Sequence, residues 1–129
     1  MKKKKIETPL VAIPRKGISQ AIQFGNILFV SGQVGEDLEG NVPEGIEAQV
    51  ELAITNAKHI IEAAGGTLDD VLMCRCFLQK LSDFGGMNKA YFKFFGDQDD
   101  GPARYTLVAP PVADELLFEI AMFVGLKEA

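Results

Sequence analysis

The stretch at residues 101–126, GPARYTLVAPPVADELLFEIAMFVGL, decides the fold expected for this chain. Two apolar, strand-like runs, residues 104–109 and 116–124, flank a turn that begins with Pro110-Pro111. The second run is almost wholly apolar, as is typical of a strand buried on both faces, yet it contains Glu119. A carboxylate in such surroundings is costly unless a cation or several hydrogen-bond donors accompany it, so the strand needs a partner or a use for it.

Arg104, at the start of the preceding run, is the obvious partner for Glu119. A simple hairpin loop at residues 110–113 would place the two residues opposite each other. The pattern supports a structural ion pair and a functional pair equally, because ion-pair networks and active sites both shift pKa values.

Length and composition indicate one compact domain, residues 1–129. The chain has 47% hydrophobic and 24% charged residues, and its net charge of −5 argues against a nucleic-acid partner. The lysine run at residues 2–5 is not followed by the apolar stretch of a signal peptide, which leaves a solvated tail or a strand edge. No apolar run is long enough to span a membrane, so we expect a cytoplasmic protein without a membrane partner.

The order of expected elements is typical of an α+β fold. Gly25-Asn26 separates two apolar runs, residues 18–24 and 27–31, and predicts a β-hairpin. An acidic, glycine-rich loop at residues 32–45 precedes a helix at residues 46–64, which Gly65-Gly66 ends. A strand at residues 71–78 and a second helix, beginning near Ser82 or Asp83, precede the final strands.

This order predicts a mixed β-sheet with two helices packed on one face. Alternation in the last strand leaves apolar side chains on the other face as well, at Leu117, Ala121 and Phe123. Soluble monomers rarely expose such a surface, so we expect a closed homo-oligomer.

The sequence context of the other reactive residues favours structural roles for them. Cys74 and Cys76 lie two apart in a strand, so their side chains share a face, and we expect buried free thiols. His59 lies off the apolar stripe of its helix, which predicts a solvent-facing side chain. Arg75 is expected to pair with an acid across the sheet or the subunit boundary. No phosphate-binding glycine motif and no set of metal ligands occurs, so we predict neither a cofactor nor a metal.

Several short motifs follow one another along the chain: SQAI at 19–22, LFVSGQV at 28–34, AAGG at 63–66, DV at 70–71, DF at 83–84, Asn88, Tyr91, Phe94-Phe95, PAR at 102–104 and FEIA at 118–121. In this order and spacing they resemble the motifs of the Rid family, also known as the YjgF family, whose best-known members are imine deaminases. The resemblance implies a chorismate-mutase-like fold and a homotrimer with three sites between subunits. It also implies that the last two strands do not form a hairpin, so that Arg104 and Glu119 meet where subunits adjoin.

The resemblance further implies roles for individual residues. Arg104 would bind the substrate carboxylate through its planar, two-pronged guanidinium, and Glu119 would activate or orient water. Thr106 would contribute mainly through its backbone. The remaining residues of the implied pocket are Ser31, Gly32 and Asn88.

The chain departs from the family pattern at three positions. Ile18 stands where a pocket tyrosine is usual, Ala121 replaces a glutamate, and Tyr105 replaces a small residue.

The function that the resemblance implies is hydrolysis of a 2-imino or enamine acid to the 2-keto acid and ammonia. The alternative is a non-catalytic, carboxylate-binding or chaperone-like trimer, which the missing tyrosine favours. An endoribonuclease, an activity attached to some relatives, is a distant third because the chain is acidic and lacks a basic groove.

Overall fold

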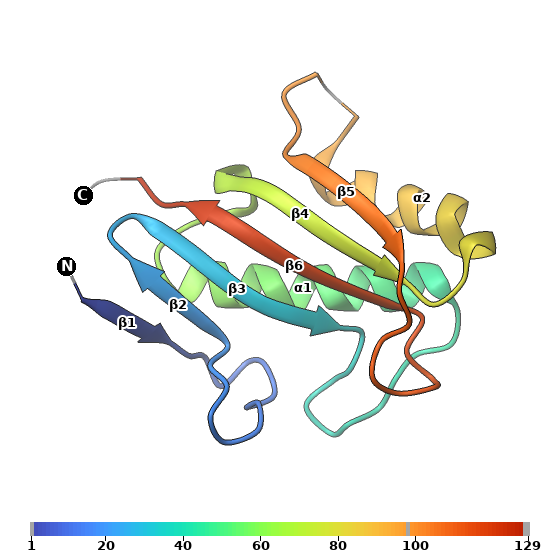
Figure 1. The fold of residues 1–129 in the computed structure, drawn as a ribbon, viewed down its shortest axis with the longest axis horizontal. Coiled ribbons are helices and arrows are strands. Elements are labelled where there is room, and N and C mark those ends of the chain that lie inside the picture. The colour runs from blue at the N-terminus through green and yellow to red at the C-terminus, as the bar shows by residue number, and fades with distance from the viewer. Residues whose placement is uncertain (1, 98, 128–129) are drawn as a thin grey trace.

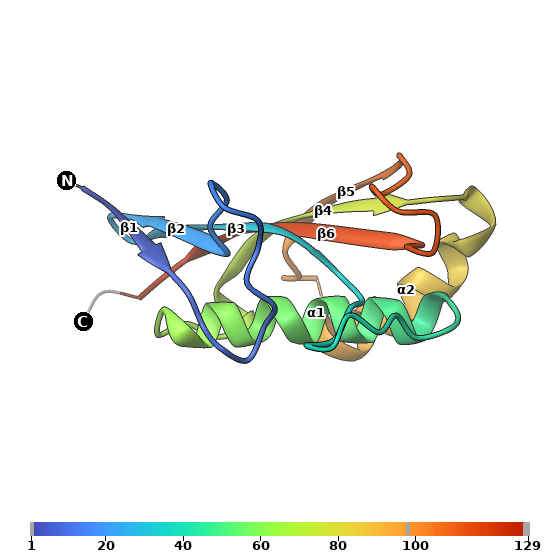
Figure 2. The same cartoon turned by 90° about the horizontal axis from the view of Figure 1, so that it is seen from below.

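The computed structural model describes residues 2–97 and 99–127, which form one sheet with helices on one side (Figures 1 and 2). The strands are β1 (Lys3–Ile6), β2 (Ala21–Phe24), β3 (Ile27–Val34), β4 (Val71–Leu78), β5 (Ala103–Val108) and β6 (Phe118–Gly125). The helices are α1 (Ile46–Ala63) and α2 (Phe84–Phe95), and short 3₁₀ turns occupy Leu68–Asp70 and Leu81–Asp83. The predicted α+β fold with two helices on one face of a mixed sheet is confirmed.

The sheet has the strand order β1-β2-β3-β6-β4-β5. Its neighbouring strands are antiparallel except β4 and β5, which are parallel and connected through α2, because parallel neighbours need a crossover connection. β6 lies between β3 and β4. The hairpin predicted from the local pattern is therefore wrong, and the expectation from the resemblance that the last two strands do not form a hairpin is confirmed. The central position gives this very apolar strand a neighbour on each side, which a terminal hairpin would not.

The first hairpin is confirmed, since β2 and β3 pair around Gly25-Asn26 with Phe24 opposite Ile27. Gly25 has a φ of 63°, the positive value that a tight turn requires and that glycine adopts without strain. The lysine run forms part of β1, which pairs with β2 at the edge of the sheet. Of the two alternatives for that run, the structure selects the strand edge.

The helix α1 covers the centre of the sheet and buries the predicted apolar stripe (Figure 2). From the sheet, β3 and β6 contribute the fully buried Leu28, Phe118, Ile120 and Val124. Gly65, with a φ of 89°, ends the helix as expected. Among the described residues, no helix is long and apolar enough to cross a membrane.

His59 differs from its prediction. Its side chain is half-buried, and its Nδ1 atom is buried without a hydrogen-bond partner among the described residues. The helical period correctly places His59 off the stripe that faces the sheet, but it does not report how the loops around α1 pack.

The second helix lies beside α1 and is held against it by close packing. A β-carbon at Gly86 would come within 2.6 Å of Ile46 Cγ2, so this glycine permits the close approach of the two helices. Asp83 occupies the N-cap position, as predicted, but its side chain makes no capping hydrogen bond. The buried residues Met87, Ala90 and Tyr91 face the core.

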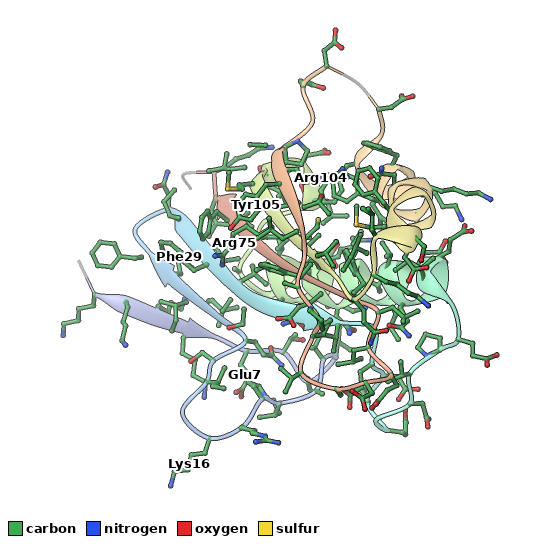
Figure 3. All side chains as sticks on the ribbon, turned by 45° about the vertical axis from the view of Figure 1, so that its right-hand side comes forward. Glu7, Lys16, Phe29, Arg75, Arg104 and Tyr105 are labelled. Carbon is green, nitrogen blue, oxygen red and sulfur yellow. The ribbon has the colours of Figure 1, made fainter. Side chains whose placement is uncertain are left out.

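The open face, meaning the sheet face that the helices do not cover, carries large apolar side chains. Phe29, Tyr105 and Leu107 are 46%, 41% and 50% exposed. Arg75 lies among them with its guanidinium carbon 5.1 Å from the centre of the Phe123 ring (Figure 3). The Nε atom of Arg75 is buried and has no hydrogen-bond partner among the described residues, so the predicted acid partner is not found within this part of the chain.

Candidate functional site

The predicted site residues fall into two separate groups. We call Asn88, Arg104 and Thr106 the arginine group; they lie on α2 and on β5. We call Ile18, Ser31, Gly32 and Glu119 the glutamate group; they lie before β2, on β3 and on β6.

The two groups face opposite sides of the sheet. Arg104 pairs with the buried Cys74 and therefore points to the helix side, where Figure 3 shows it between β5 and α2. Glu119 lies between the fully buried Phe118 and Ile120 in β6, so strand alternation directs it to the open face. One copy of the chain does not bring Arg104 and Glu119 together.

The guanidinium group of Arg104 lies among three aromatic rings of α2 and its N-terminal turn, which we call the aromatic cage. Its carbon is 4.8 Å from the ring centre of Tyr91, 5.8 Å from that of Phe92 and 5.9 Å from that of Phe84. A cation near aromatic faces is stabilised by the ring quadrupoles. The cage fixes the position of the positive charge without using its hydrogen-bond donors.

Unpartnered polar atoms gather in the arginine group. The buried atoms Arg104 Nη1, Thr106 Oγ1 and Asn88 Oδ1 have no hydrogen-bond partner among the described residues. Asn88 lies one helical turn from both Phe84 and Phe92, so it is on the side of α2 that carries the aromatic cage. Buried polar atoms are almost always paired, and a cluster without partners indicates a place prepared for a polar ligand.

Arg104 and Thr106 border a hollow of about 410 Å³, which we call the Arg104 hollow. Its lining residues are Leu78, Leu81, Phe84, Arg104, Tyr105, Thr106, Leu107 and Val108. Tyr105 and Leu107 direct their side chains to the open face, and apart from Arg104 and Thr106 the other side chains of this wall are apolar. Such a surface with a few convergent polar groups is typical of small-molecule sites.

The carboxylate of Glu119 packs against Gly32 on β3. The register of β3 against β6 shifts between Val30 and Gln33, so the chain forms a bulge there. A β-carbon at Gly32 would overlap the Glu119 carboxylate, so a larger residue there would move this side chain away from β3.

Burial raises the pKa of Glu119 above its ordinary value of 4.5. No salt bridge to Glu119 occurs within the described residues. The carboxylate therefore has the environment of an acid or base that exchanges protons closer to neutral pH.

The other members of the glutamate group line a hollow of about 510 Å³ next to the bulge. Ile18, Ser31 and Gly32 all border it. The Ser31 hydroxyl donates a hydrogen bond to the Ser19 carbonyl oxygen at 2.6 Å, which ties β3 to the segment that carries Ile18. Ile18 itself is 56% exposed and gives this hollow an apolar wall.

Sequence reasoning missed the role of Gln20, which shapes this second hollow. The buried Gln20 side chain accepts a hydrogen bond from the Thr8 N–H at 2.8 Å and donates to the Thr8 and Val11 carbonyl oxygens at 3.1 Å. These bonds hold the N-terminal segment against the sheet. A glutamine within an apolar hairpin strand is the signal that could have indicated it, since a buried amide needs partners.

The aromatic cage was also missed as a unit. Its rings were predicted to lie on a helix, but their contact with Arg104 joins α2 to β5. A short-range sequence pattern does not report which side chains of two separate elements meet.

The two cysteines are structural. Both are buried and free, as predicted, and burial raises the pKa of Cys74 to about 11 and that of Cys76 to about 12, so both remain thiols at neutral pH. Within residues 2–97 and 99–127, no three His, Cys, Asp or Glu side chains come together as metal ligands would.

Comparison with known proteins agrees with this architecture. The family model described as Endoribonuclease L-PSP matches residues 10–125. A RutC family protein of Pyrococcus abyssi is 37% identical over 93% of this chain and 94% of its own length. A 2-iminobutanoate/2-iminopropanoate deaminase of Dermatophagoides farinae is 34% identical over 97% of this chain and 98% of its own.

A solved structure extends the comparison from sequence to fold. The crystal structure of RidA from the Antarctic bacterium Psychrobacter sp. PAMC 21119 superposes with a TM-score of 0.87 at 32% identity, covering 95% of this chain and 99% of that one. The chain therefore belongs to the Endoribonuclease L-PSP family, which is the Rid family that its motifs resemble.

Proposed function

We propose that this protein hydrolyses 2-imino and enamine acids to 2-keto acids and ammonia. In the proposal, three copies assemble, and each site combines the arginine group of one copy with the glutamate group of its neighbour. The single observation that carries it is the cluster of unpartnered polar atoms at Arg104, Thr106 and Asn88 beside the aromatic cage. The similarity to a relative named as an imine deaminase adds support.

The arginine group supplies the binding step. The free donors of Arg104 match the two oxygens of a substrate carboxylate, and Thr106 adds a hydroxyl beside them. Because the aromatic cage already holds the guanidinium, little side-chain freedom is lost when the substrate binds.

Glu119 supplies the proton transfers. As the carboxylate accepts one proton of a water molecule, the water oxygen bonds to C2, and the C=N electrons move to the nitrogen, which receives that proton. The C2–N bond of this intermediate then breaks while the hydroxyl proton passes to nitrogen, ammonia leaves, and C2 becomes a carbonyl. Both protons of the water end on the departing ammonia, so the reaction needs no other reactant.

Assembly into trimers is part of the proposal because the two groups lie on different sides of one chain. The exposed apolar residues of the open face are the surface that such an assembly would bury, since patches of this kind usually mark an interface. A closed ring of copies repeats one contact, which brings each arginine group to the same neighbouring surface. The small-molecule partner is then an imino or keto acid.

A non-catalytic trimer that binds carboxylates is the second candidate, because Ile18 offers no hydroxyl to the site. An endoribonuclease has less support, since the net charge of −5 disfavours binding of a phosphate backbone.

The test is the release of ammonia from 2-imino acids generated in place by an amino-acid oxidase. We expect the protein to accelerate release over the spontaneous rate. Arg104→Ala should lower kcat/KM by roughly 30-fold or more, the scale of removing one partner of a charged pair. The trimer should persist in light scattering. Ammonia release at the spontaneous rate, with carboxylate binding intact, would favour the non-catalytic alternative.

A further inference from the structure

We infer that the preferred substrate carries a large apolar side chain, branched aliphatic or aromatic, and that this side chain occupies the Arg104 hollow against Leu81. This inference rests on the proposed function, because it places the carboxylate of an imino acid on Arg104. It adds the identity of the group attached to C2 and names Leu81 as a residue that determines specificity.

The first argument is the position of the polar atoms within the Arg104 hollow. Arg104 and Thr106 are neighbours on one side of β5, and their unpartnered atoms supply the carboxylate-binding end. The substituent on C2 begins one bond from that carboxylate. Thr106 borders this hollow and not the other hollow beside Arg104, so the substituent enters here, against the apolar side chains of Leu78, Leu81, Phe84 and Val108.

The second argument is the exposure of that wall. Leu81 is 69% exposed, Val108 is 55% exposed and Phe84 is 40% exposed, although all three border the same hollow. A methyl side chain would leave most of this surface in contact with water. A branched or aromatic side chain would remove it from water, and the gain grows with the apolar area buried.

The third argument is the size of the hollow. Its volume of about 410 Å³ lies in the range of cavities that hold a whole small molecule. A two- or three-carbon imino acid would fill only a fraction of it.

The hollow beside the glutamate group is more mixed, with apolar side chains next to polar ones such as Gln20 and Asn56. Ile13 and Ile18, which border it, are 61% and 56% exposed, so the glutamate group also lies beside apolar surface. Where the arginine group of one copy meets the glutamate group of another, the apolar residues of both sides surround the reacting carbon. In the Arg104 hollow, no charged or amide side chain of the described residues other than Arg104 borders the space for the group at C2.

The experiment compares 2-imino acids generated from L-leucine, L-phenylalanine and L-alanine. We expect kcat/KM to be at least about tenfold higher for the first two, because added methylenes in an apolar pocket are worth roughly 10-fold or more. Leu81→Ala should reduce this preference several-fold, mainly through a higher KM for the large substrates. Leu38→Ala is the matched control, since Leu38 is 57% exposed and borders none of these hollows.

The results distinguish a substrate side chain in the Arg104 hollow from a contact with a neighbouring copy. Equal kcat/KM for large and small imines, or a preference that Leu81→Ala leaves unchanged, overturns the inference. A change in light scattering with an unchanged preference would show instead that Leu81 contacts a neighbouring copy.

Failure of the proposed function is measured separately. If no imine is hydrolysed faster than spontaneously, calorimetry with 4-methyl-2-oxopentanoate and pyruvate still tests the hollow. If the larger acid binds more tightly than pyruvate, and Leu81→Ala removes this difference, the inference about the hollow is supported and only the proposed reaction is wrong. Equal binding of the two acids would overturn it.

Discussion

The arginine group and the glutamate group hold their charges in contrasting ways. Arg104 is surrounded by aromatic rings that leave its donors unpartnered, whereas Glu119 lies against a glycine backbone without a cation and with a raised pKa. The first environment stabilises a charge and prepares it to bind an anion. The second destabilises a charge and prepares it to take up a proton.

An ion pair between the two residues within one chain would have removed both properties. It would have used the donors of Arg104 and lowered the pKa of Glu119, because a nearby opposite charge favours the ionised carboxylate. Within one chain, the sheet separates the two groups, so neither neutralises the other there. Within the described residues of one chain, the ion pair that the sequence supported equally with a functional pair is not formed.

The largest effect is expected for Glu119→Gln, which keeps the shape of the side chain and removes its ability to transfer protons. We expect turnover to fall ~10²-fold or more, the usual scale for loss of a general acid or base. Binding of a keto acid at the arginine group should remain. A large fall in melting temperature together with lost activity would instead indicate that Glu119 serves the structure.

Because the pKa of Glu119 is raised, the melting temperature of Glu119→Gln should depend on pH differently from that of the parent. Folding favours the protonated form, so the stability from this group is present below pH 4.5 and is lost as pH rises through the folded pKa. Glu119→Gln should therefore melt at the same or a higher temperature than the parent at neutral pH, and its melting should depend less on pH. Activity of the parent should fall, as pH is lowered, at a higher pH than an ordinary glutamate would produce.

Mixed assemblies test whether the two groups meet across copies. Arg104→Ala and Glu119→Gln chains, refolded together in equal amounts, should regain roughly a quarter of the parent activity, since that share of sites receives both intact residues. Each variant alone serves as the control. Mixtures that stay as inactive as the separate variants, with mixed trimers verified by mass spectrometry, would place both groups of one site on a single chain.

The smallest effect is expected for Ile18→Tyr, which tests whether Ile18 of the glutamate group borders the substrate. A tyrosine would restore the hydroxyl that is usual in the family, and a new hydrogen bond of ordinary strength corresponds to an increase of roughly fivefold. The substrate for this test is the small 2-iminopropanoate. Unchanged or lower rates with intact assembly would argue against Ile18 as a pocket residue.

Much of the fold could be predicted from periodicity. The strand at residues 71–78 agrees with β4 at both ends, and the helix that begins at Ile46 ends one residue before its predicted limit. These elements bury one continuous stripe or face, so their apolar pattern carries their boundaries. The insertion of β6 between β3 and β4 could not be read this way, because an apolar run does not specify which strands it joins.

The candidate site was predictable only in part, and for a related reason. The residue types at 88, 104, 106 and 119 came from motifs, but the environment of each depends on contacts between distant segments. The half-buried His59 shows the same limit, since a helical wheel gives the direction of a side chain but not how much of it other segments cover. Gln20 shows that a buried polar residue can be as informative as an apolar one once its partners are known.

The lysine-rich β1 has a consequence for the behaviour of the protein at high concentration. A sheet edge with unpaired backbone groups is a template on which another chain can add a strand, and repeated addition leads to fibres. At the β1 edge, Lys3, Lys4 and Lys5 are all exposed, so a second copy approaching in register would bring like charges together. Repulsion between these lysines therefore opposes the growth of a continuous sheet from one molecule to the next at the β1 edge.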